Sequence, residues 1–341
     1  MDNLLLRLTK KKKQLDSHQP IPPELRKNIE EWLKVELTYS SNAIEGNTLT
    51  RIETAEVIER GITAVINGKP LKDQIEAINH AKALDFINQL ARTRKSHQFI
   101  TEKDILDIHK IILTGIDDNW AGKYRLTEVF IRGSNAEFPM PNSLHIEMRN
   151  FISWLQAQQD DHPVKIAADA HMKFVSIHPF IDGNGRTTRL LMNLILLLNG
   201  YPMGIIRNEE RTAYLNSFES AQNKKDMQPF YTIIFTSVER SLDIYLNALS
   251  KKNAVFKEFE TQPQEELLKI GSLAKKTGET IHTLRFWTKE GLLNAKDHTP
   301  SGYQLYEHSA IDVVKRIRQL QLEKRLTIEE IKKVLREEDN K

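Results

Sequence analysis

The sequence predicts a mainly α-helical protein with a small C-terminal domain, and three observations carry that prediction. Residues 1–100 are rich in helix-forming residues at helical spacing and show no alternating strand pattern. Residues 190–198 form an apolar run too dense for a surface helix, so we expect a buried central helix there. From residue 251 the chain becomes polar and then enters a stretch of short helical and strand-like segments.

These features divide the chain into four parts. We predict an N-terminal helical region over residues 1–100, a core over 101–250, a linker over 251–265 and a separate domain over 266–341. The length of 341 residues and the hydrophobic content of 40% are enough for a sizeable core.

Composition excludes several classes of protein. The formal net charge of +3 is too small to indicate a class of partner by itself. The absence of cysteine excludes disulfides and thiolate metal sites, and agrees with a reducing compartment. The amino terminus places leucines before a lysine run, the wrong order for a signal peptide, and no apolar run is long enough to span a membrane. We therefore expect a cytoplasmic protein with no membrane partner.

The lysines at 10–13 favour a solvated helix face over a nucleic-acid patch.

The first segment with a chemical signal is SSNAIEGNTLT, residues 40–50. If residues 33–45 are helical, Ser41 and Glu45 share one face, and Gly46 is placed to end the helix. A glutamate at a helix C-terminus is unfavourable against the helix dipole, so we expect a cation to pair with Glu45. Read alone, the segment fits a simple capping arrangement equally well.

The strand signal of the first 250 residues lies around Gly133. Two apolar runs between Val129 and Met140 flank Gly133, which predicts a β-hairpin, with a surface loop as the alternative. Residues 149–154, 167–174 and 229–250 continue the helical pattern. His171, within the second of these segments, fits a packing or capping role.

The most informative stretch is HPFIDGNGRTTR, from His178 to Arg189. Pro179 prevents a helix directly after His178, while Gly183 and Gly185 permit backbone conformations that other residues avoid. The helix that follows would begin with free backbone N–H groups and the positive end of its dipole, which together bind anions.

Four side chains extend this anion site. Arg186 and Arg189 lie three residues apart on one helical face, where both can bind phosphate oxygens. Asp182 can hold a magnesium ion together with phosphates and water. His178, with an ordinary pKa near ~6.5, can accept a proton from a hydroxyl group. Each feature alone is more often structural, but together they predict a phosphoryl- or nucleotidyl-transfer site. Walker A, dinucleotide-binding and EF-hand patterns are excluded.

The stretch resembles, without a gap, the Fic family motif HPFx(D/E)GNGRxxR. This resemblance implies a Fic-fold helical bundle with a short β-hairpin flap, which transfers AMP from ATP to a protein Ser, Thr or Tyr hydroxyl with magnesium. His178 then corresponds to the base and Asp182 to the magnesium ligand. Gly183, Asn184 and Gly185 correspond to the anion hole, Arg186 to a phosphate clamp and Arg189 to the γ-phosphate ligand.

Two further segments fit the same resemblance. Ser41, Glu45 and Gly46 match the Fic inhibitory motif (S/T)xxxE(G/N), which implies that Glu45 pairs with Arg189 and blocks the γ-phosphate. The same glutamate is implicated in removing AMP, so the chain could work in either direction. The flap would hold an extended target segment by strand addition. Its residues are Val129, Phe130, Ile131, Arg132 and Gly133.

The nucleotide base is expected near residues 211–226. In relatives this region supplies a tyrosine and an asparagine around the adenine. Tyr214 is suited to stacking on a base, but Gln222 stands at the expected asparagine position and Asn223 is displaced by one. Transfer from a nucleotide other than ATP therefore remains an alternative.

Residues 266–341 predict two short helices around a turn, a β-wing and two more helices, which is the layout of a winged helix-turn-helix. Between residues 269 and 325, eleven Lys and Arg face six Asp and Glu, so the basic excess of the chain is concentrated here. The domain resembles the MerR family, although Phe286-Trp287 replaces the usual Tyr-Tyr and Gln304 replaces a common arginine. The resemblance implies DNA contacts from Arg285, Lys289 and Tyr303, with protein contact as the alternative.

Two functions follow as hypotheses. The first is a protein adenylyltransferase, inhibited by its own Glu45 and able to modify itself or another protein. The second is a DNA-binding transcriptional regulator whose Fic part senses a nucleotide. The long dimerisation helix of the MerR family has no counterpart before Lys341, so we expect any homodimer to form through the Fic portion.

Overall fold

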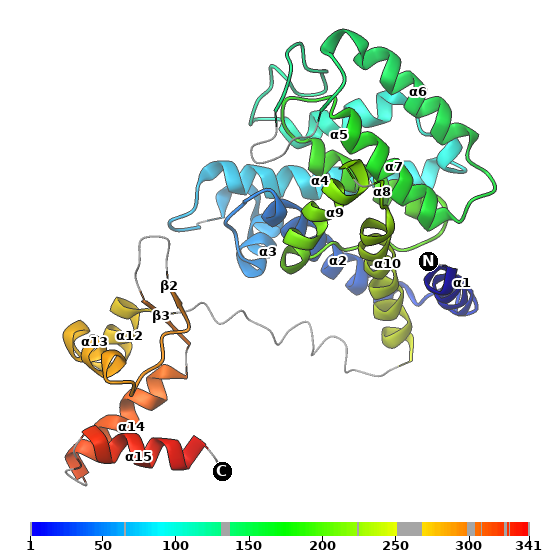
Figure 1. The fold of residues 1–341 in the computed structure, drawn as a ribbon. Coiled ribbons are helices and arrows are strands. Elements are labelled where there is room, and N and C mark those ends of the chain that lie inside the picture. The colour runs from blue at the N-terminus through cyan, green and yellow to red at the C-terminus, as the bar shows by residue number, and fades with distance from the viewer. Residues whose placement is uncertain are drawn as a thin grey trace. The chain divides into compact units, whose positions relative to one another are not determined.

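The computed structural model describes residues 2–64, 66–130, 137–223, 225–250, 268–298, 304–307, 309–323, 326 and 328–339. The chain forms two compact units, Met1–Asn253 and Ala254–Lys341, drawn in Figure 1. The predicted linker, 251–265, lies outside the described residues. None of the helices in the described ranges has the length and apolar character that a membrane crossing requires.

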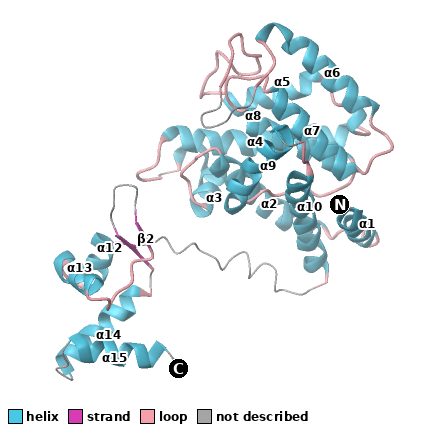
Figure 2. Ribbon diagram, in the orientation of Figure 1, coloured by secondary structure: helices cyan, strands magenta, loops and turns pink. Residues whose placement is uncertain are grey.

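The first unit is built from α-helices joined by turns and short 3₁₀ segments, which confirms the mainly α prediction (Figure 2). In chain order the helices are α1 (Asp2–Asp16), α2 (Pro23–Ile44), α3 (Arg51–Arg60), α4 (Leu71–Thr93), α5 (Glu102–Leu113), α6 (Leu144–Ala157), α7 (Pro163–Ile177), α8 (Asn184–Leu198), α9 (Arg211–Asn223) and α10 (Gln228–Leu249). The 3₁₀ segments are Gly61–Thr63, His97–Phe99, Pro141–Ser143 and Asn208–Glu210. Among the described residues of this unit no strand occurs, and the centre of the predicted hairpin, 131–136, lies outside them.

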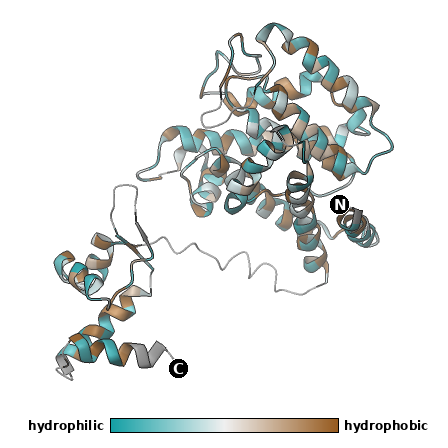
Figure 3. Ribbon diagram, in the orientation of Figure 1, coloured by the Kyte–Doolittle hydropathy of each residue, from teal (hydrophilic) through white to brown (hydrophobic). Residues whose placement is uncertain are grey.

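The helix α8 is the centre of this unit. All residues from 190 to 196 are buried, as the dense apolar run predicts. The helix packs against α7, α4, α5 and α2, and Figure 1 shows it in the interior of the unit. A peripheral helix looks different, because α6 buries only Leu144, Met148, Phe151 and Leu155. Hydrophilic and hydrophobic residues accordingly alternate around α6 in Figure 3.

The N-terminal helices pack directly onto the predicted core. α1 lies against α10, where Lys11 forms an ion pair with Asp243 at 2.7 Å. α2 packs against α4 and α8, which brings its C-terminal end to the N-terminal end of α8. Arg211 of α9 fixes that end by donating a 2.7 Å hydrogen bond from Nε to the carbonyl of Ile44. The end of α2 and the residues that follow it are therefore an integral part of the first unit.

The second unit contains a small antiparallel sheet of strand order β1-β3-β2 and two pairs of helices. Its elements are β1 (Leu268–Lys269), α12 (Ile270–Thr277), α13 (Ile281–Lys289), β2 (Asp297–His298), β3 (Gln304–Tyr306), α14 (Ala310–Glu323) and α15 (Ile328–Asp339). Thr280 caps α13 by accepting a hydrogen bond from the Thr283 amide. Leu273, Leu284, Trp287 and Ile317 form its core. This arrangement matches the predicted winged helix-turn-helix.

Candidate active site

The loop between α7 and α8 adopts the turn that its sequence predicts. His178 and Gly183 both have left-handed backbones, with φ of 49° and 78°. Asn184 closes the loop from inside: its Oδ1 accepts from the Phe180 amide at 3.0 Å, and its Nδ2 donates to the Phe180 carbonyl at 2.8 Å. The side chain of Asn184 is thus committed to the loop. Its backbone N–H is what remains for the predicted anion hole.

His109 of α5 supports the same loop. Its ring stacks on Phe180 with centroids 3.5 Å apart, and its Nδ1 accepts a 3.0 Å hydrogen bond from the Gly122 amide. The ring proton therefore lies on Nε2, which donates to the carbonyl of Asp182 at 3.0 Å. Burial lowers the pKa of His109 to about 4, so the ring is neutral at pH 7. Sequence reasoning missed His109, because no local pattern signals a contact with a loop so far along the chain.

His178 has the environment of a neutral imidazole. Burial lowers its pKa to about 4, below the ordinary value that the sequence suggests. Its Nδ1 is buried, and a hydrogen bond with the backbone of Val175 partly offsets the effect of burial on the pKa. The ring lies 4.5 Å from that of Phe138, centroid to centroid. A neutral imidazole is the form that can accept a proton.

Arg125 connects His178 to the flap region. This buried side chain donates from Nε to the carbonyl of His178 at 2.9 Å, and from its two terminal nitrogens to the carbonyls of Thr127 and Pro139. Thr127 and Pro139 lie on either side of segment 131–136, so one guanidinium holds both flanks against the catalytic loop. Sequence reasoning did not single out Arg125. Of the predicted flap residues, Phe130 is 84% exposed, whereas Ile131, Arg132 and Gly133 lie outside the described residues.

Asp182 fits the magnesium ligand that the sequence predicts. Its side chain is 54% exposed at the mouth of the loop, and its Oδ1 accepts a hydrogen bond from the Gly183 amide at 2.5 Å. No group of three or more His, Asp or Glu side chains in the described ranges could hold a metal ion by itself. A single exposed carboxylate suits magnesium that takes its other ligands from phosphate and water.

Arg186 is buried between two carboxylates. Its Nη1 lies 3.0 Å from Glu76 Oε1 of α4, and its Nη2 lies 3.4 Å from Asp182 Oδ1. Its Nε and Nη1 are both buried without a hydrogen-bond partner among the described residues, so the contact with Glu76 is an ion pair rather than a hydrogen bond. The sequence predicts Arg186 as a phosphate clamp, but it gives no sign of Glu76.

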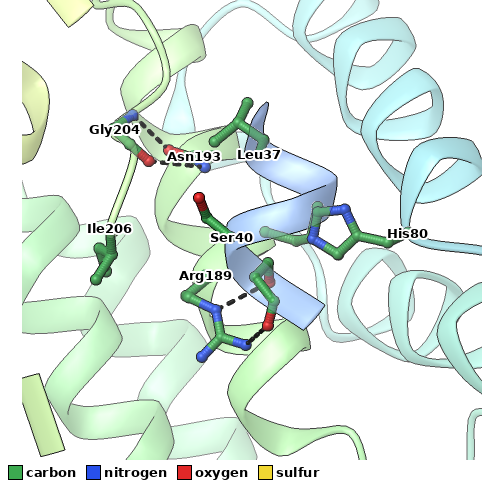
Figure 4. Close-up of a pocket in the computed structure, with 9 residues that line it drawn as sticks. Leu37, Ser40, His80, Arg189, Asn193, Gly204 and Ile206 are labelled. Atoms are coloured by element: carbon green, nitrogen blue, oxygen red, sulfur yellow. Dashed lines mark hydrogen bonds between the residues drawn. The ribbon is translucent and has the colours of Figure 1, made fainter. Parts of the chain in front are cut away.

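Arg189 and Glu45 meet as the sequence predicts. Arg189 Nη2 lies 2.7 Å from Glu45 Oε1, and Arg189 also donates from Nε to Ser41 Oγ at 2.9 Å. Figure 4 shows Arg189 reaching from α8 towards α2, beside a small pocket also lined by His80 and Asn193. Burial lowers the pKa of Arg189, but the Glu45 carboxylate and the Tyr214 hydroxyl together more than offset this, so the pKa lies above its ordinary value.

The carboxylate of Glu45 also occupies the anion cradle. Gly185 lies in the first turn of α8, and a Cβ at this position would collide with Glu45 Oε1. Gly46 ends the inhibitory segment with φ of +96°, a conformation that glycine adopts without strain. Glu45 therefore stands where an anionic ligand of the helix N-terminus would bind.

Tyr214, the residue predicted to stack on the base, is buried in this structure. The side chain is 1% exposed, and its hydroxyl forms a 2.7 Å hydrogen bond with His171 Nε2. Burial raises the pKa of Tyr214 to about 12. Its ring packs on Phe218 at 4.8 Å, so the described structure leaves no open face for a base. Gln222 is exposed at the end of α9, next to Asn223.

In the second unit, the predicted DNA contacts Arg285 and Lys289 are both exposed on α13, while Tyr303 lies outside the described residues. Phe286 and Trp287, which stand where the MerR family usually has Tyr-Tyr, lie in different environments. Phe286 is 44% exposed, whereas Trp287 is buried in the core with the Arg318 guanidinium over its ring at 5.0 Å.

The fold and the site together define an α-helical protein in which Glu45, at the end of α2, fills the space over the N-terminal turn of α8. Residues 99–196 match the Fic/DOC family, and residues 268–338 match the MerR HTH family regulatory protein. A Fic domain containing signaling protein from Bacteroides thetaiotaomicron is 31% identical with a TM-score of 0.64, and the match covers 72% of this chain and 98% of that one. The chain belongs to the Fic/DOC family.

Two eukaryotic proteins are also similar. Fic-1 from C. elegans is 30% identical with a TM-score of 0.67, over 74% of this chain and 73% of that structure. The protein adenylyltransferase Fic of Culex quinquefasciatus is 39% identical over 247 residues, which make up 72% of this chain and 48% of that protein. The chain spans about half the length of the curated relatives it matches.

Proposed function

We propose that this chain is a protein adenylyltransferase that transfers AMP from ATP to a protein Ser, Thr or Tyr hydroxyl and is inhibited by its own Glu45. The observation that carries the proposal is the position of the Glu45 carboxylate, paired with Arg189 and in the space over Gly185. A carboxylate held at a helix N-terminus takes the place of a phosphate. The curated relatives named protein adenylyltransferase Fic support the choice of reaction.

In the proposed reaction, the hydroxyl oxygen of the target forms a bond to the α-phosphorus of ATP. The bond from that phosphorus to the bridging oxygen breaks, and pyrophosphate leaves. His178 accepts the hydroxyl proton in its neutral form, and because Nδ1 is buried, Nε2 is the nitrogen left for it. The backbone N–H groups of the first turn of α8, with Arg186 and Arg189, bind the phosphate oxygens. Magnesium held by Asp182 would neutralise phosphate charge.

Inhibition follows from charge and space. With Glu45 in place, the γ-phosphate loses Arg189 as a partner and meets a second negative charge. A bias of about 1.4 kcal/mol towards the blocked arrangement reduces productive binding about tenfold. The Glu45 side chain is 37% exposed, so it can also reach a water molecule. We include removal of AMP from modified targets in the proposal.

The test is intact-mass spectrometry of the Glu45→Gly variant after incubation with ATP and magnesium. We expect a mass increment of one adenylyl group on the variant itself or on an added target protein. The same experiment with Glu45→Gly His178→Ala should give no increment, because the proton acceptor is gone. Parallel incubations with GTP, CTP and UTP show which nucleotide is the donor, because each would add a nucleotidyl group of a different mass. No increment from any nucleotide would exclude a transferase and favour a nucleotide sensor.

We propose that the second unit binds DNA. The supporting observations are the match to the MerR HTH family regulatory protein and the exposed Arg285 and Lys289 on α13. A cytoplasmic location is part of the same proposal. Formation of a homodimer through the first unit stays a prediction.

A further inference from the structure

A chain of polar contacts joins the turn after α2, residues 45–48 and here called the inhibitory turn, to Arg186. Asn47, which follows Gly46, donates from Nδ2 to Glu76 Oε2 at 2.9 Å. The other oxygen of the same carboxylate, Oε1, lies 3.0 Å from Arg186 Nη1. Arg186 continues to Asp182, with Nη2 at 3.4 Å from Oδ1. One carboxylate of α4 thus contacts the inhibitory turn with one oxygen and the phosphate clamp with the other.

The turn itself is anchored to the same helix. Asn47 Nδ2 also donates to the carbonyl of Asp73 at 2.9 Å. The amide and the hydroxyl of Thr48 both donate to Asp73 Oδ2, at 2.7 Å. The first turns of α4 therefore set where the chain after Glu45 lies. If the inhibitory turn moved, the hydrogen bond from Asn47 would shift the carboxylate of Glu76 with it.

The burial of this pair is unusual for charged groups. The Arg186 side chain is 3% exposed and that of Glu76 is 9% exposed. A second cation near Glu76 is Lys72, whose side chain is 59% exposed and whose Nζ lies 3.8 Å from Glu76 Oε1. A buried ion pair adds little net stability, because desolvation of both charges opposes their attraction. The two side chains of such a pair must nevertheless stay together, because burying either charge without the other would be costly.

Glu76 also decides which way Arg186 faces. The guanidinium lies between two carboxylates, and the one from α4 is the closer. Without Glu76, Arg186 would be attracted to Asp182 alone, where it would neutralise the exposed carboxylate at the mouth of the site. Nε and Nη1 of Arg186 are both buried without a hydrogen-bond partner among the described residues, so charge attraction rather than hydrogen-bond geometry joins Nη1 to Glu76.

We propose that Glu76 is a positioning residue for nucleotide binding: it orients Arg186 towards the phosphates of ATP, and Asn47 couples that orientation to the turn that carries Glu45. This inference rests on the proposed function, because it takes ATP as the ligand of the cradle. Glu76 makes no contact with the nucleotide and acts through Arg186.

The test measures ATP affinity by isothermal titration calorimetry in the Glu45→Gly background, with magnesium present. Glu76→Gln keeps the size of the side chain and removes its charge. We expect it to raise the Kd for ATP by about tenfold, within the range that misplacing a positioning group produces. Asn47→Ala in the same background should raise the Kd in the same direction by about threefold, because it frees one oxygen of the carboxylate.

The matched control is Asp85→Asn, which removes an exposed carboxylate from the same helix, paired only with Lys34 among the described residues. It should leave the Kd unchanged. Melting temperatures of all variants separate a loss of fold from a loss of orientation; if Glu76→Gln does not fold, Asn47→Ala decides. An ATP affinity equal to that of the parent in the folded variants would overturn the inference. If the parent binds ATP yet transfers no AMP, the proposed function fails and the role of Glu76 is still measured.

Discussion

The cradle of the first unit and the helix α13 of the second unit use positive charge in opposite ways. Arg186 and Arg189 are buried, and each is tied to a carboxylate from a helix far away in the sequence. Arg285 and Lys289 are exposed on α13. A buried cation depends on its partner, so one carboxylate can switch it. Exposed cations instead contribute a field that salt screens. The first arrangement suits regulated chemistry, and the second suits contact with a polyanion.

The largest expected effect is a loss of folding stability of the first unit as the pH falls, which tests how strongly its charges and imidazoles depend on burial. Burial lowers the pKa of His80 and of His171 to about 3 each. In the unfolded chain both histidines titrate near ~6.5, so below that pH the unfolded state binds more protons than the folded state. Stability therefore falls as pH falls from 6.5 towards 3. We expect a loss on the order of 1 kcal/mol per buried histidine for each pH unit, measured by urea unfolding at pH 7, 6 and 5.

The control for this pH dependence is a histidine outside the core. His171→Gln removes one buried imidazole and should flatten the dependence, whatever its effect on stability at pH 7. His18→Gln changes an exposed residue of the same unit and should leave the dependence as it is. Equal slopes for His171→Gln and the unmodified protein would show that burial of this ring does not govern acid unfolding.

The next expected effect concerns the hydrogen bond between Ser41 of α2 and Arg189. Ser41→Ala removes the oxygen that accepts from Arg189 Nε, so the blocked arrangement becomes weaker. We expect AMP incorporation by the otherwise native chain to rise about threefold to tenfold, the equivalent of one hydrogen bond. Ser40→Ala is the matched control, because Ser40 Oγ donates to Glu36 rather than contacting Arg189. An equal rise from both variants would count against a specific role of Ser41.

The smallest expected effect concerns the exposed cations of α13 and the salt dependence of DNA binding. Binding of the protein to its own upstream DNA, measured by filter retention over a range of salt concentrations, should weaken steeply as salt rises. Arg285→Ala and Lys289→Ala should each reduce the slope of log K against log salt by about 1. Lys10→Ala, which changes an exposed lysine of the first unit, should leave the slope unaltered. A slope that none of the three changes would favour the protein-contact alternative for this unit.

Several features were predictable because their signals are local. The turn at His178–Gly183 and the buried α8 follow from Pro179, the two glycines and the apolar run. The end of α2 at Ile44 follows from Gly46. The burial of Tyr214 was not predictable, because a sequence pattern cannot tell a tyrosine buried against His171 from one open to a ligand. The predicted flap strands have no counterpart in their described flanks, and the centre of the flap is not described.

The sequence alone determined the chemistry within reach of this chain: a histidine, a carboxylate, backbone amides and two arginines within one turn and the helix that follows it, and a basic domain at the other end. Beyond the Glu45–Arg189 pair, only the tertiary structure decided the partners of these groups. Glu76, His109 and Arg125 reach the loop from α4, from α5 and from the segment before the flap, through contacts of side chains distant in the sequence. Such contacts depend on how helices pack, and packing is a property of the whole core rather than of any segment.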